Sequence, residues 1–149
     1  MNRLYLRTIL FLSRISIGWL FLYAGLDKIF NPSWTSKGYL LGAKTLPGVY
    51  AFFASPGILP FVDFLNEWGL TLLGISLILG VLVRFSSWFA VLLMFLYYLP
   101  VLQFPYVGEH SFLVDEHIIY IFFLLMLGAL NAGRSWGLDS LLRKKGKKG

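Results

Sequence analysis

The sequence contains no cysteine and few charged residues. Without cysteine, the chain can form no disulfide, no thiolate metal site and no cysteine-ligated iron–sulfur cluster. Charged residues make up 13% of its 149 residues, whereas hydrophobic residues make up 58%. Soluble domains usually carry about a quarter charged residues. The composition therefore predicts one integral membrane domain that covers residues 1–149.

Acidic residues are scarce, with seven Asp and Glu against thirteen Lys and Arg. A net charge of +6 can indicate a nucleic-acid partner, but five of the cations lie in the last seven residues and most others flank apolar runs. This distribution is typical of topology signals and lipid-headgroup contacts. We therefore expect the lipid bilayer as a partner and no nucleic acid. The first apolar run contains Arg14 and no small-residue cleavage site, so it predicts a retained span rather than a signal peptide.

The long apolar runs predict an all-α fold, an integral membrane four-helix bundle. The expected spans cover about residues 8–30, 61–83, 85–102 and 116–133, and a basic tail follows at 134–149. A long connection joins the first two spans, and prolines and glycines interrupt it. Its middle, residues 49–54, is too apolar for a solvated loop and too short to span. It predicts a short interfacial or re-entrant segment in a long outer loop.

The distribution of cations predicts the orientation of these spans. Four spans place both termini on one side of the membrane. Ten cations then lie on the terminal side and three on the other. The ten are Arg3, Arg7, Arg14, Arg84, Arg134, Arg143, Lys144, Lys145, Lys147 and Lys148, and the three are Lys28, Lys37 and Lys44. The positive-inside rule predicts a multi-pass protein of the cell membrane with both termini in the cytoplasm.

Titratable groups gather at the expected outer ends of the spans. They are Asp27, Lys28, Asp63, Glu67, Glu109, His110, Asp115, Glu116 and His117. Only twelve residues separate Arg14 from Asp27, or about 18 Å of helix against about 30 Å of hydrocarbon, so charge must reach membrane depth. The uncharged part of the second span is sixteen residues long, which draws Glu67 to the hydrocarbon boundary. Ionisable groups at such depth favour a functional interpretation.

Several separated segments resemble one known family. The run RISIGWLFLYAGLDKIF at 14–30, followed by NPSWTSKGYLLGA at 31–43, is similar to the opening of DoxX/DoxD-like membrane proteins. The run NEWGLTLLGISLILGVLVR at 66–84 fits the second helix of that family. The elements DEHIIY at 115–120 and GRSWGLD at 133–139 fit its fourth helix and the exit from it. The resemblance covers nearly the whole chain, with the elements in the right order.

The resemblance implies a membrane oxidoreductase subunit. The family includes the large membrane subunit of thiosulfate:quinone oxidoreductase, whose loop the WTSKGYL segment at 34–40 particularly resembles. The implied reaction joins two thiosulfates to tetrathionate and passes two electrons to a membrane quinone at the extracytoplasmic mouth of the bundle. Thiosulfate or a related small sulfur compound is thus the expected donor, quinone the expected bound acceptor, and a small partner subunit is implied.

We expect no haem, iron–sulfur cluster or other metal. A b-type haem needs axial ligands on facing helices, whereas His110 and His117 come from one local segment, and His110 is expected in a loop. A site made of carboxylates and His117 would be chemically allowed, but its residues show no metal-ligand spacing.

Quinone reduction needs a proton relay and hydrogen bonds to the quinone oxygens, and an anionic sulfur compound needs cations. The candidate catalytic residues are Glu67, His117, Asp115, Glu116 and Asp27. The candidate substrate- and quinone-binding residues are Arg14, Lys28, Trp34, Tyr39, Tyr23 and Tyr120. Arg14 can contribute only if its side chain faces the core. Asp139, after Trp136, is expected to cap and fix the tail.

Structural alternatives stay open for each of these residues. Asp27 and Lys28 can pair at a helix end, His117 can be an interfacial residue, and Trp34 and Tyr39 can sit at the membrane surface. At the level of the whole protein, the alternative is a non-catalytic anchor for a soluble redox partner, and a small transporter is less favoured. A homodimer also stays open, because Gly18 and Gly25 form a small-residue face suited to helix packing.

Overall fold

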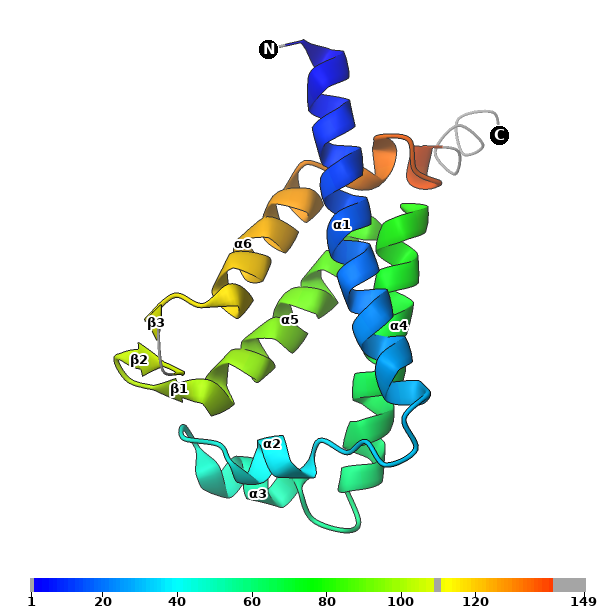
Figure 1. Ribbon diagram of the computed structural model, residues 1–149. Helices are drawn as coiled ribbons and strands as arrows, with labels where there is room; N and C mark the ends of the chain where they lie inside the picture. Colours follow the sequence, from blue (N-terminus) through cyan, green and yellow to red (C-terminus); the bar gives the residue numbers. More distant parts are fainter. Residues whose placement is uncertain (1, 109–110, 141–149) are drawn as a thin grey trace.

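The computed structural model describes residues 2–108 and 111–140 and is built mostly of helices (Figure 1). The longer helices are α1 (Arg3–Ile29), α4 (Leu59–Leu79), α5 (Val83–Val101) and α6 (Glu116–Ala129). The shorter ones are α2 (Lys37–Leu41), α3 (Pro47–Phe53) and the 3₁₀ helix η1 (Ala132–Arg134). Helices α1, α4 and α5 are long and apolar enough to cross a membrane, and α6 is apolar but shorter. Glu109, His110 and the tail from residue 141 lie outside the described residues.

Helix α6 departs most clearly from the expected spans. It ends at Ala129, whereas the expected span continued to residue 133. The helix cannot continue because Asn131 adopts a left-handed backbone with φ 49°, which starts a turn into η1. The fourteen residues of α6 span about 21 Å, less than the roughly 30 Å of a hydrocarbon core. A four-helix membrane bundle therefore stays a prediction.

Helices α1 and α4 form the most extensive helix pair. A methyl group added at Gly74 of α4 would lie 2.7 Å from both the Gly18 carbonyl oxygen and the Leu22 Cα of α1. One added at Gly25 of α1 would lie 2.6 Å from the Thr71 backbone nitrogen of α4. The small residues thus let the two backbones touch, which is how helices gain packing energy in lipid. The Gly18–Gly25 face therefore packs against α4 of the same chain, and a homodimer stays untested.

The segment after α6 folds back onto the turn between α4 and α5. The backbone amides of Leu138 and Asp139 donate to the carbonyl oxygens of Leu79 and Gly80, at 3.1 and 2.9 Å. The Asp139 carboxylate accepts from the amides of Leu82 at 2.8 Å and of Val83 at 3.2 Å. A carboxylate that accepts from the first amides of a helix stabilises its N-terminus. Asp139 therefore caps α5 and fixes the segment 131–140 at what we call the terminal end, where α1 also begins (Figure 1).

Helices α2 and α3 lie at the opposite end, which we call the loop end (residues 30–58; Figure 1). They form a small core of their own from Leu40, Ala43, Tyr50 and Ala54. The expected interfacial or re-entrant segment, 49–54, falls mostly on α3, and its depth in a bilayer stays a prediction.

A proline in α5 provides the attachment point for these short helices. Pro100 has no amide proton, so it cannot satisfy the carbonyl of Leu96 four residues earlier. The Tyr50 hydroxyl donates to that carbonyl at 3.0 Å. The Lys44 amide donates to the Pro100 carbonyl at 2.8 Å, and the Thr45 hydroxyl donates to the Leu102 carbonyl at 2.6 Å. The loop end is thereby attached to the end of α5.

A small antiparallel sheet, which the sequence pattern did not predict, connects α5 to α6. Its strands are β1 (Leu102–Gln103), β2 (Tyr106–Val107) and β3 (Ser111–Phe112), in the order β1-β2-β3. Leu102 pairs with Val107, and Val107 pairs with Ser111. Two-residue strands are too short to produce a visible alternation of apolar and polar residues. The sheet and the Tyr98 hydroxyl, which donates to the Leu113 carbonyl at 2.6 Å, direct the chain into α6.

The contact between α1 and α4 predicts opposite effects for two similar substitutions. Gly74→Ala should destabilise the protein by about 2 kcal/mol or more, because the new methyl meets the backbone of α1. Gly69→Ala, on the same helix with nothing within 4 Å, should stabilise it by about 0.5 to 1 kcal/mol through helix propensity. Thermal unfolding in detergent measures both. Equal effects of the two variants would contradict the close packing.

Candidate functional site

A cavity of 450 Å³ opens at the loop end between helices that are far apart in the sequence. Its walls come from the end of α1, the connection that follows it, α2, α4, the end of α5 and the start of α6. The lining residues are Lys28, Trp34, Thr35, Ser36, Tyr39, Asn66, Tyr97, Val101, Glu116 and His117. Its volume falls within the range of small-molecule sites, about 300 to 1,000 Å³. The lining combines aromatic rings with a few polar groups, which is typical of such sites.

Asp63 of α4 holds one wall of this cavity in place. Its carboxylate accepts from the Thr35 hydroxyl at 2.8 Å, the Ser36 amide at 2.8 Å and the Ser36 hydroxyl at 2.5 Å. Hydrogen bonds to an ionised acceptor are stronger than those between neutral groups. Asp63 therefore fixes the segment between Trp34 and Tyr39 against α4.

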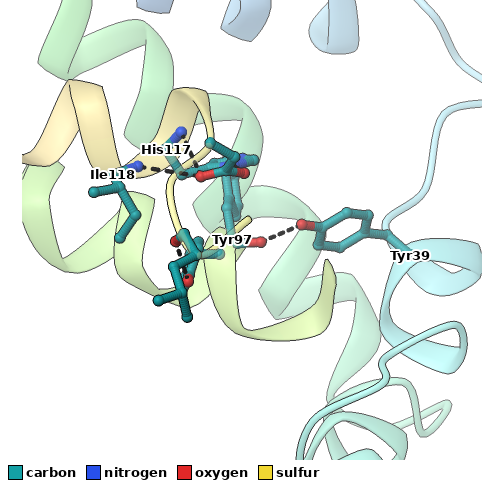
Figure 2. Close-up of polar contacts among 7 residues, drawn as sticks. Tyr39, Tyr97, His117 and Ile118 are labelled. Atoms are coloured by element: carbon teal, nitrogen blue, oxygen red, sulfur yellow. Dashed lines mark hydrogen bonds and ion pairs between the residues drawn. The ribbon is translucent and has the colours of Figure 1, made fainter. Parts of the chain in front are cut away.

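Tyr39 of α2 and Tyr97 of α5 line one side of the cavity. The Tyr39 hydroxyl donates to the backbone carbonyl of Tyr97 (Figure 2). The Tyr97 hydroxyl donates to the Asn66 side-chain oxygen. The two rings meet edge to face, with their centroids 6.2 Å apart. Burial raises the pKa of Tyr39 to about 12, with smaller contributions from Tyr50 and the nearby carboxylates. Tyr39 therefore remains a neutral hydrogen-bond donor at physiological pH.

Asp115 and His117 form a hydrogen-bonded pair at the start of α6. Their atoms Oδ2 and Nδ1 are 2.6 Å apart, and the two side chains are only 12% and 17% exposed. The other Asp115 oxygen accepts from the backbone amides of His117 and Ile118, at 3.0 and 3.3 Å, so Asp115 also caps α6. A carboxylate acceptor favours the proton on Nδ1, which leaves Nε2 of the neutral ring able to accept a proton. The ring packs edge-on against Tyr97, at 6.2 Å between centroids.

Lys28 brings positive charge to the cavity. Its ammonium nitrogen lies 5.2 Å from the centre of the Trp34 ring and donates to the Ala24 carbonyl at 3.1 Å. Within residues 2–108 and 111–140, no carboxylate oxygen lies within 4.0 Å of this nitrogen. The charge is therefore available to an anion that enters the cavity.

The structure brings together about half of the residues that the sequence singled out. Lys28, Trp34, Tyr39, Glu116 and His117 line the cavity, and Asp115 holds His117. Four other candidates do not line it; these are Tyr23, Asp27, Glu67 and Tyr120.

These four residues lie elsewhere on α1, α4 and α6. Tyr23 is 65% exposed on the outside of α1, where a lipid chain would contact it. Asp27 is exposed on the same helix. The backbone of Glu67 faces Gly25 of α1, and Tyr120 packs against the main apolar core.

Arg14 is not part of this cavity, contrary to expectation. It lies fourteen residues before Lys28 on α1, a distance of about 21 Å along the helix. Its side chain is fully buried at the terminal end, where Nη1 donates to the Ala132 carbonyl at 3.3 Å. Gly80 and Gly137 make room for the guanidinium, since a methyl group at either would collide with it. Arg14 therefore joins α1 to the segment 131–140 rather than binding a substrate at the loop end.

The sequence did not single out Asn66 and Tyr97 as site residues, although both line the cavity. A tyrosine near the end of an apolar run is typical of an interfacial aromatic belt, so Tyr97 carried no distinctive signal. Asn66 is neutral and stands next to Glu67, and in the sequence only the charged residue indicated a site. Asp63 was recognised as one acid of the outer group, but its partners lie 27 and 28 residues away, so spacing could not show its role. Among the described residues, no group of three or more His, Asp or Glu is placed to hold a metal ion.

Comparison with protein families identifies the chain. Residues 9–102 match the family model described as DoxX. The match covers more than half of the sequence, so the protein belongs to the DoxX family, as the sequence motifs predicted. It includes the cavity residues from Lys28 to Val101 and ends before Asp115, Glu116 and His117. No curated protein and no solved structure matches the chain.

The contacts of Asp63 predict a local effect of its removal. Asp63→Ala should lower the stability of the segment 33–41 by about 2 kcal/mol, because three hydrogen bonds to a carboxylate are lost. Hydrogen–deuterium exchange of that segment should accelerate while exchange in α5 stays unchanged. Asp27→Ala is the matched control, since Asp27 is exposed. Equal exchange in the wild type and Asp63→Ala would contradict this role.

Proposed function

We propose that this DoxX-family membrane protein is an oxidoreductase subunit that passes electrons from thiosulfate or a related small sulfur compound to a membrane quinone. The observation that carries the proposal is the cavity at the loop end, where a hydrogen-bonded Asp115–His117 pair, a cation and aromatic rings converge. The resemblance of the segment 34–40 to the thiosulfate:quinone oxidoreductase subunit adds the substrate class.

The proposal includes an arrangement in the membrane. Helices α1, α4 and α5 cross the bilayer, and α6, extended by the residues around it, completes a four-helix bundle. The terminal end then faces the cytoplasm of the cell, as the excess of cations there predicts. The loop end faces the outside, with α2 and α3 at the interface. A small soluble sulfur anion could reach the cavity from that side.

The residues of the cavity fit a quinone headgroup. Its volume of 450 Å³ holds a substituted ring, and the side chains of Trp34, Tyr39 and Tyr97 supply flat apolar surfaces. His117 supplies a polar group that can hydrogen-bond to a ring oxygen. When bound, a quinone accepts two electrons and two protons and becomes a quinol.

Within this chain, His117 is the proposed proton donor to that site. His117 lines the cavity, and Asp115 holds its ring in place through the contact with Nδ1. Glu116, the next acid in the lining and exposed to solvent, can return a proton to His117 from outside water. Tyr39 and Asn66 keep the tyrosine wall in position through their hydrogen bonds with Tyr97.

Lys28 is the proposed anchor for the sulfur anion. Formation of one S–S bond between two thiosulfate anions gives tetrathionate and releases two electrons, which balance the two electrons required for quinol formation. This reaction requires no cysteine of the chain, because the sulfur atoms bond to each other and no enzyme persulfide forms. Placing the ammonium of Lys28 against Trp34 keeps it directed toward the cavity.

The proposal is tested by thiosulfate-driven reduction of a soluble quinone analogue with detergent-purified protein. His117→Gln should lower turnover by about 10²-fold or more, because a positioned proton donor contributes about that much. Asp115→Asn keeps a good helix cap but loses the carboxylate that holds His117, so turnover should fall while α6 stays folded. Glu67→Gln, outside the cavity lining, should retain activity.

Other outcomes separate the alternatives. Loss of turnover in Glu67→Gln but not in His117→Gln would reject the cavity as the site. Absence of turnover in the wild type, with quinone retained on the protein, would indicate that a partner subunit is required. Absence of both turnover and quinone would favour a non-catalytic anchor for a soluble redox partner.

A further inference from the structure

A second cleft lies at the terminal end, between the start of α5 and the end of α6. Its volume is 360 Å³, and none of the residues that line it lines the loop-end cavity. The walls include Arg84, Ser87 and Trp88 of α5 and Leu124, Gly128 and Asn131 of α6 or just after it. Neither the family match nor the proposed electron transfer gives this cleft a role.

Ser87 is the feature that indicates a ligand. The residue is only 2% exposed and lines the cleft, yet its hydroxyl has no hydrogen-bond partner within the described part of the chain. Serines in helices commonly donate to a carbonyl one turn earlier, and a buried polar group without a partner is unfavourable. Gly128 keeps the space beside this hydroxyl, since a methyl group there would lie 3.2 Å from the Ser87 Cβ.

The polar groups of the cleft follow a definite order with depth. Arg84 stands in the first turn of α5, is exposed, and makes no ion pair among residues 2–108 and 111–140. Ser87 lies three residues further along α5, about 4.5 Å deeper toward the middle of the helix. Trp88 and Leu125 supply apolar surface at and below that level. A cation, then a hydroxyl donor, then an apolar wall therefore line the cleft from the end inward.

We propose that this cleft binds an anionic phospholipid from the leaflet on the side of the termini. The phosphate would contact the Arg84 guanidinium, an ester carbonyl would accept from the Ser87 hydroxyl, and an acyl chain would lie along Trp88 and Leu125. This order of groups matches the depth profile of a phospholipid. A free phosphate would use only Arg84, whereas a zwitterionic lipid would use the cation less well. Basic pockets between membrane helices commonly hold such headgroups.

The experiment is a titration of the purified full-length chain with phosphatidylglycerol, with phosphatidylcholine and with inorganic phosphate, read by native mass spectrometry and thermal unfolding. Phosphatidylglycerol should bind and raise the unfolding temperature more than either of the others. Arg84→Gln should weaken its binding about fivefold or more, as expected for one arginine at an anionic headgroup. Arg7→Gln is the matched control, since it removes an exposed arginine at the same end but outside the cleft.

Ser87→Ala distinguishes a binding role from a structural one. The variant should weaken phosphatidylglycerol binding about threefold to tenfold, the loss of one hydrogen bond. Without lipid, the unfolding temperature should stay the same or rise, because a buried hydroxyl without a partner is removed. The proposal is overturned if phosphatidylcholine or inorganic phosphate binds as well as phosphatidylglycerol. Equal binding by Arg84→Gln and Arg7→Gln, or a lower unfolding temperature of Ser87→Ala without lipid, would also overturn it.

Discussion

The close contact of α1 with α4 determines the geometry of the loop end. In lipid, apolar side chains gain little by leaving one apolar surface for another, so helix pairs depend on intimate backbone packing. Gly18, Gly25 and Gly74 allow that packing here. Gly25 stands one turn before Lys28, and its contact with Thr71 lies just over one turn from Asn66. The same contact that joins the helices therefore sets the distance between two walls of the cavity.

Three of the seven acidic residues of the chain organise its backbone. Asp63 binds the amide of Ser36, Asp115 binds the first amides of α6, and Asp139 binds those of α5. Each of these three carboxylates accepts from backbone amides at or just before the start of a helix, where those amides have no partner within the helix. Asp115 alone among these three also holds a titratable ring, and this double role is why we propose the start of α6 as the centre of chemistry at the loop end.

The sequence carried the large features of the fold because they rest on composition. Long apolar runs predicted the helical spans, and the ordered motifs predicted the family, which the match over residues 9–102 confirms. The predicted end of the last span, residue 133, was wrong because α6 ends at Ala129, just before the left-handed residue Asn131. An apolar pattern does not reveal a single backbone angle. The three-stranded sheet was missed because its strands have two residues each.

The site was only partly predictable, for a related reason. Titratable residues near helix ends could be recognised, so Lys28, Glu116 and His117 were found, along with Trp34 and Tyr39 from the family-like loop. The position of a residue along a helix can be read from the sequence. Which side of the helix its side chain faces cannot be read without knowing the neighbouring helices. Tyr23 therefore faces outward, and Arg14, read as a ligand for the outer site, is buried at the other end.

Arg14 and Lys28 lie at opposite ends of the molecule, and the polar groups of these two ends differ in chemistry. The loop end combines an imidazole, carboxylates and a cation around aromatic rings. The terminal end combines arginines, glycine-lined contacts and a cleft of 360 Å³. We propose that the redox chemistry takes place at the loop end. Photolabelling of the purified protein with a photoreactive quinone, followed by peptide mapping, tests this proposal. We expect label on residues 34–39 and around Tyr97, and excess unlabelled quinone should reduce it. Label confined to the Arg84–Trp88 region would contradict the proposal.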